Sequence, residues 1–217
     1  MVEIRQVILA RSLQMIRSTA GTVGYFPDLV RQIKIRYGFI TAPKDEDLLP
    51  SDPPKGAEFQ HGRLLNRDRL IIIDRLTLWS DGIVADASSS TEDMDRFLED
   101  IGEWAKTAIP KATPIGPRYY LSQIEVKMDN PLEAHAPKFR PIGERIAALL
   151  GDYGIQTPRY ELSSLNLYFD ILGRVNPQPG AFSLDRRQNI PYVENVWFSQ
   201  APLKTADHIA LLNEFEK

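Results

Sequence analysis

Alternating apolar and polar residues flank an Asp-Gly pair in the first half of the chain. Residues 76–84 read Leu-Thr-Leu-Trp-Ser-Asp-Gly-Ile-Val, with the pair at Asp81-Gly82. Asp-Gly accepts the positive φ angles of a two-residue hairpin turn, and the flanking residues favour strands. We therefore predict antiparallel strands over about 69–79 and 82–87.

From residue 90 onward, the apolar residues follow the spacing of a helix instead of the alternation of a strand. Ser90 and Thr91 offer hydroxyls to helix amide groups, and Glu92 and Asp93 oppose the positive end of the helix dipole. Apolar residues then recur every three or four positions, with charged residues between them. The apolar set is Met94, Phe97, Leu98, Ile101, Trp104 and Ala105. A similar helix is predicted from Thr205. Its apolar face consists of Ile209, Leu211, Leu212 and Phe215.

These two helices match each other when the chain is shifted by 114 positions. Thr91 then falls on Thr205, and Pro27 falls on Pro141. Each proline stands at the first turn of another predicted helix, and both of those helices end at a Tyr-Gly pair, a common stop signal. The apolar residues of the earlier helix are Leu29, Val30, Ile33 and Tyr37. Those of the later helix are Ile142, Ile146, Leu149, Leu150 and Tyr153.

Strands fill the remaining positions in matching order. They are predicted at about 4–14, 57–65, 69–79 and 82–87, and again at about 119–128, 160–171, 181–187 and 195–200. Each half reads as strand, helix, three strands, helix, so we predict an α+β fold of two tandem βαβββα pseudo-repeats. The halves are residues 1–110 and 111–217, joined in one compact domain with an antiparallel sheet and four helices on one face. The alternative is that an ordinary α+β protein holds two similarly capped helices, since the first strands share no identities under this shift.

Composition limits the classes of partner. The 217 residues are 43% hydrophobic, which is enough for a sizeable core, and carry a net charge of -3. This charge gives no overall basic field, so binding to nucleic acid is not expected. The chain has no cysteine, which excludes disulfides, thiolate zinc sites and cysteine nucleophiles.

No segment has the pattern of a membrane or export signal. Residues 1–15 interrupt their apolar positions with charged side chains and lack a small-residue cleavage site. Elsewhere, no uncharged apolar run approaches the ~20 residues that a membrane helix needs. We therefore expect a cytoplasmic protein without a membrane partner.

Several common catalytic and nucleotide-binding motifs are missing from the sequence. It contains no phosphate-binding loop, dinucleotide fingerprint, GxSxG elbow or HExxH helix. The three histidines, His61, His135 and His208, lack local metal-ligand spacing. We expect no metal site and no cofactor, and we assign no catalytic residue.

One short pattern keeps an enzymatic alternative open. Glu125 and Lys127 lie two positions apart on a predicted strand, which puts an acid and a lysine on one strand face, as in PD-(D/E)xK nucleases. Such a nuclease also needs a further acid on a neighbouring strand. The alternation with apolar neighbours equally describes the solvated face of a half-buried strand.

A polar, arginine-rich loop between the last two predicted strands is the candidate binding site. Arginine and aromatic residues are enriched at binding hot spots because they combine contact area with directional hydrogen bonds. The candidate residues are Arg186, Arg187, Asn189, Tyr192 and Trp197. In the alternative interpretation, the arginines pair with local acids and the aromatic rings pack on the sheet.

The functional hypothesis is a non-enzymatic protein-binding or adaptor subunit of a larger assembly. Its partner would be another protein or a second copy of the chain. Two alternatives stay open: a helix-grip protein that binds a small molecule between sheet and helices, and a metal-dependent nuclease that uses Glu125 and Lys127.

Overall fold

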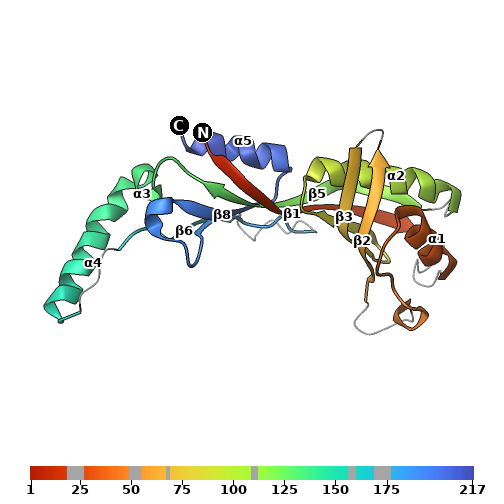
Figure 1. Ribbon diagram of the computed structural model, residues 1–217, viewed down its shortest axis with the longest axis horizontal. Helices are drawn as coiled ribbons and strands as arrows, with labels where there is room; N and C mark the ends of the chain where they lie inside the picture. The colour runs from red at the N-terminus through yellow and green to blue at the C-terminus, as the bar shows by residue number, and fades with distance from the viewer. Residues whose placement is uncertain (19–26, 49–54, 67–68, 109–111, 156–159, 169–176) are drawn as a thin grey trace.

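The computed structural model describes most of the chain (Figure 1). The described residues are 1–18, 27–48, 55–66, 69–108, 112–155, 160–168 and 177–217. They form one antiparallel sheet of eight strands. The prediction of an α+β fold with an antiparallel sheet is therefore confirmed. The expectation that four helices cover one face is not met, because the helix over residues 140–152 projects away from the sheet.

A long central strand pair organises the sheet. From edge to edge the strands are β2 (Ala57–Asn66), β3 (Arg69–Leu78), β4 (Gly82–Ala87), β1 (Glu3–Ser18), β5 (Ala112–Lys127), β8 (Val196–Ala201), β7 (Phe182–Arg186) and β6 (Ser164–Leu167). β1 and β5 pair from Glu3 opposite Lys127 to Ser18 opposite Ala112. Outward from this pair, the order is β4-β3-β2 on one side and β8-β7-β6 on the other.

Strand boundaries differ from the prediction mainly at the centre and at one edge. β1 and β5 are longer than predicted, because each supplies backbone hydrogen bonds to the other over its full length. β6 has only four residues, and residues 160–163 precede it without regular structure. Residues 169–171 of that predicted strand lie outside the described residues.

Helices complete the chain between these strands. They are α1 (Pro27–Tyr37), α2 (Thr91–Ala108), α3 (Leu132–His135), α4 (Arg140–Asp152) and α5 (Thr205–Phe215), with short 3-10 turns at Asp45–Leu48, Pro137–Phe139 and Tyr192–Glu194. α2 and α5 lie on the same side of the sheet, above the two ends of the central pair (Figure 1).

The first half has its own hydrophobic core between α1, α2 and the sheet. Met94, Phe97, Leu98 and Ile101 of α2 are buried there, as predicted. From α1, Tyr37 places its ring 5.0 Å from Phe97, and its hydroxyl donates a hydrogen bond to Asp100 at 2.8 Å. α1 therefore docks on both α2 and the sheet.

A second core lies between α5 and the strands of the second half. Its largest fully buried side chain is Trp197, and Leu212 of α5 packs in the same cluster. Leu211, which was also predicted to be buried, is 38% exposed. That prediction is wrong: Leu211 lies outside the second core and stays partly open to solvent. α4 projects away from the body of the molecule (Figure 1).

The two cores meet where α2 and α5 begin head to head. The Thr91 amide donates to Thr205 Oγ1 at 3.1 Å, and the Thr205 amide donates to Thr91 Oγ1 at 2.7 Å. Both threonines are buried. Each helix therefore uses the hydroxyl of the other to satisfy a free N-terminal amide, an exchange that fixes the two helices relative to each other.

Candidate functional site

Asparagines hold the loop between β7 and β8 in place. Asn189 and Asn195 adopt left-handed φ angles of 63° and 51°, which asparagine tolerates better than most residues. The Asn195 side-chain amide donates to the carbonyls of Met128 at 2.8 Å and Asn130 at 2.7 Å. The loop is thus anchored to the end of β5 by side-chain hydrogen bonds.

Arg186, the last residue of β7, points inward, and its side chain is only 6% exposed. Its Nη2 lies 3.2 Å from Glu161 Oε2, and its Nη1 donates to the Tyr192 carbonyl at 3.0 Å. The guanidinium also stacks between two rings, 4.1 Å from the centre of Tyr192 and 4.5 Å from that of Trp197. These contacts give Arg186 a structural environment in the protein itself.

The indole of Trp197 is likewise internal. The residue is fully buried, and its Nε1 donates to Asn195 Oδ1 at 2.9 Å. Tyr192 remains 47% exposed over the arginine. The candidate set is therefore divided: Arg186 and Trp197 contact the protein interior, and Tyr192 presents surface.

Arg187 and Asn189 line a cavity of about 540 Å³ together with Glu125 and Phe198. Glu125 alternates with buried Ile124 and Val126, so this cavity lies on the face of the sheet away from the helices. Arg187 Nε approaches Glu125 Oε2 to 2.7 Å, and the arginine is 43% exposed.

The contact between Arg187 and Glu125 is relevant to the alternative that the protein is a metal-dependent nuclease. Glu125 faces a guanidinium, whereas a metal-dependent nuclease would place further acidic ligands around it. Among the described residues, no group of three or more histidine, aspartate or glutamate side chains is arranged to hold a metal ion. Glu125 on β5 is instead held in an ion pair with Arg187, the first residue after β7.

A buried serine–histidine contact lies inside the second core. His208 Nε2 is 2.9 Å from Ser199 Oγ, and Ser199 Oγ itself donates to the Ser183 carbonyl at 3.0 Å. The serine has one proton, so the histidine is the donor in their contact, the reverse of a nucleophile–base pair. Burial lowers the pKa of His208 to about 4, so this histidine is neutral at pH 7.

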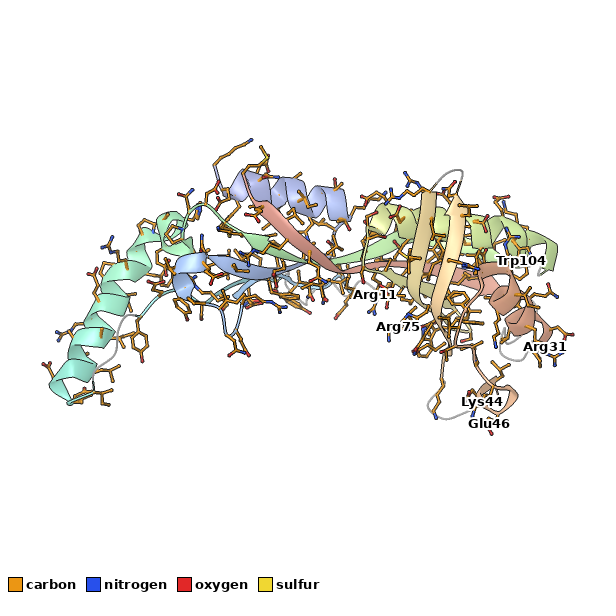
Figure 2. All side chains as sticks on the ribbon, viewed as in Figure 1. Arg11, Arg31, Lys44, Glu46, Arg75 and Trp104 are labelled. Carbon is orange, nitrogen blue, oxygen red and sulfur yellow. The ribbon has the colours of Figure 1, made fainter. Side chains whose placement is uncertain are left out.

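The side of the sheet opposite the helices also carries a cluster of charges in the first half. Buried Asp86 accepts hydrogen bonds from Arg11 Nε at 2.7 Å and from Arg75 Nη2 at 2.9 Å. Figure 2 shows both arginines on the side of the strands away from α2. Two guanidiniums compensate one buried carboxylate, which is the condition for keeping such a charge inside a protein.

The exposed surface of α4 was not predicted from the sequence, although the helix and its apolar positions were. Three of those apolar side chains are well exposed: Ile142 at 55%, Ile146 at 37% and Tyr153 at 70%. Tyr37, at the corresponding end of α1, is 1% exposed. Helical spacing identifies an apolar stripe, but it does not identify what covers that stripe.

A groove of about 470 Å³ runs between α4 and residues 160–162. Gly143 closes it on one side, because a Cβ atom there would stand 2.5 Å from the Tyr160 carbonyl oxygen. Phe139 and Ile142 form part of its apolar lining. Ile142 and Ile146 are both exposed on α4. Among the described residues, no other α-helix has two large apolar side chains that are exposed in this way.

Comparisons with known proteins give no assignment. No protein-family model matches the chain, and no curated protein matches it. Among the described residues, no helix combines the length and apolar character that crossing a membrane requires.

Proposed function

We propose that this chain is a cytoplasmic protein-binding subunit of a larger assembly, and that it binds its partner through α4. The observation that carries the proposal is the exposed apolar stripe of α4 at Ile142, Ile146 and Tyr153. Clusters of exposed apolar side chains mark interaction surfaces in folded proteins. On α1, the comparable stripe is covered by α2 and the sheet.

The amount of exposed surface supports the same proposal. The accessible surface of the chain is 13558 Å². A folded monomer of 24.6 kDa is expected to expose about 10,000 Å². The excess of roughly 3,500 Å² is several times the ~800 Å² that one partner buries in an interface of standard size.

We further propose that the two halves are repeats of one βαβββα unit. In support, the strands leave the central pair in the same order on both sides, and Thr91 and Thr205, which are 114 positions apart, cap each other's helices. In such a duplication, α1 and α4 are counterparts. The second half would then have kept the helix but released it from the sheet for an external contact.

The loop between β7 and β8 is proposed as a secondary part of the binding surface. Arg187, Asn189 and Tyr192 supply its accessible side chains, whereas Arg186 and Trp197 hold the loop in shape. No comparable observation favours the helix-grip or the nuclease alternative, and neither is proposed.

The test of this function is an α4 variant in cells of the native source. We expect the double change Ile142→Glu and Ile146→Glu to remove a stoichiometric protein partner from affinity-purified complexes, because two charges would enter an apolar contact. The matched control is Ile35→Glu, which changes an isoleucine that is 81% exposed on α1. Identical complexes from the α4 variant and the wild type would contradict the proposal.

A further inference from the structure

We propose that the partner of α4 is α4 of a second copy, and that the two helices pack antiparallel as a short coiled-coil seam. This inference rests on the proposed function, because it names the partner of the same surface. The spacing of the apolar residues of α4, the flank that the described residues leave open and the charges on that flank support it.

The apolar residues of α4 and its flanks follow a heptad pattern. They alternate spacings of three and four positions, which is the arrangement of seam residues in a coiled coil. The members are Phe139, Ile142, Ile146, Leu149 and Tyr153. This spacing is the one through which one helix packs against another, and the neighbouring apolar Leu150 widens the same side of α4.

Among the described residues, the rest of the protein covers one flank of the seam. On that flank, Gly143 packs against the Tyr160 backbone, and Ala147 lines the same groove. The opposite flank carries Arg145 and Asp152, both exposed. A partner helix can therefore reach the seam from the side of these two charges.

The two charges indicate a second copy in antiparallel orientation. Arg145 and Asp152 stand seven positions apart, so they occupy equivalent places beside the seam. In an antiparallel pair, Arg145 of each copy lies beside Asp152 of the other, and two ion pairs form. In a parallel pair, Arg145 would instead lie beside Leu150, which offers no charge.

The helix dipoles favour the same orientation. Asp152 lies in the last turn of α4, where the negative end of the dipole disfavours a carboxylate. An antiparallel partner brings its positive N-terminal end to this position. A twofold axis between the helices makes one seam serve both copies, which is the usual form of a homodimer interface.

A cysteine introduced at the seam tests the pairing directly, since the chain has no cysteine of its own. In the antiparallel pair, Ile146 of one copy lies beside Leu149 of the other. We expect Ile146→Cys to give a covalent dimer in high yield with a short bis-maleimide. The control, Ile35→Cys, places an exposed cysteine on α1 and should remain largely monomeric.

Charge reversal tests the orientation. We expect the wild type to sediment with about twice the monomer mass of 24.6 kDa. Arg145→Glu alone and Asp152→Lys alone should each shift the protein to monomer, because like charges then face each other across the seam. An equimolar mixture of these two single variants should form heterodimers, and the double variant should form homodimers again.

The outcomes separate this inference from the function on which it rests. A monomeric wild type without the Ile146→Cys cross-link would overturn the second-copy inference. If Ile142→Glu with Ile146→Glu still removed a different stoichiometric protein, the proposed function would stand alone. Dimers unaffected by both single charge reversals would overturn the antiparallel pairing, provided that circular dichroism shows folded variants.

Discussion

At the scale of single residues, the side chains with the most marked chemistry are engaged within the protein. Arg186 is enclosed by a carboxylate, a carbonyl and two rings, and His208 is enclosed beside Ser199. The sequence shows that an arginine or a histidine is present and could bind a ligand. Whether its side chain is accessible to a ligand depends on burial in the folded protein. Arg186 and His208 therefore affect the free energy of unfolding, and His208 also affects how that free energy depends on pH.

His208 makes stability sensitive to acid. Burial lowers its pKa from 6.5 to about 4, so below pH 6.5 the unfolded chain binds a proton that the folded protein excludes. The stability that a neutral His208 provides is therefore fully present above about pH 6.5, and it is lost as the pH falls toward 4. Between pH 7.5 and 5 this one group should cost about 2 kcal/mol.

Urea unfolding at the two pH values measures this effect. The variant His208→Gln should lose less stability between the two pH values than the wild type loses. Equal acid sensitivity of wild type and His208→Gln would show that His208 titrates normally.

The neighbouring arginines of the β7–β8 loop should respond differently to substitution. Arg186→Leu removes a nearly buried guanidinium from its contacts with Glu161, the Tyr192 carbonyl and two rings, and should cost about 3–5 kcal/mol of unfolding free energy. Arg187→Leu breaks a partly exposed pair with Glu125 and should cost no more than about 1 kcal/mol. Chemical denaturation of both variants checks this order, and equal losses would show that Arg186 is not the structural residue of the pair.

At the scale of elements, each helix is defined locally but docked by its surroundings. α2 follows its sequence pattern closely, with its apolar face buried as predicted. α5 departs at one residue: Leu212 is fully buried, but its neighbour Leu211 is 38% exposed. The difference arises because Leu212 packs in the second core with Trp197, whereas Leu211 points away from that cluster.

This difference gives a matched test within α5. Leu212→Ala removes methyl groups from a packed core and should lower the unfolding free energy by about 2–5 kcal/mol. Leu211→Ala removes the same atoms from a partly solvated position and should change it by less than about 1 kcal/mol. Thermal and urea unfolding compare them, and similar losses would mean that Leu211 is covered in solution.

At the scale of the whole molecule, one sheet joins two cores that face the same side. The central β1–β5 pair carries the sheet from one core to the other, and the reciprocal threonine caps connect the helices above it. The molecule is elongated, with α4 at one end (Figure 1). This shape gives a large surface relative to mass, which is the physical basis of the proposed assembly role.

The sequence by itself determined the local structure. The Asp81-Gly82 turn, the helix starts at Thr91 and Thr205 and the apolar face of α2 depend on interactions between residues close in the chain, and they match the structure. The same holds for the α+β class, which follows from the order of strand and helix patterns.

Only the tertiary structure decided which of these surfaces are covered. The length of β1 and β5, the burial of Arg186 and Trp197, and the exposure of α4 depend on contacts between residues far apart in the chain. The spacing of apolar residues gives each helix an apolar side. This spacing is the same whether or not the helix packs against the sheet. The free energy of burial depends on the partner surface, so the apolar side of α1 is buried while that of α4 is exposed.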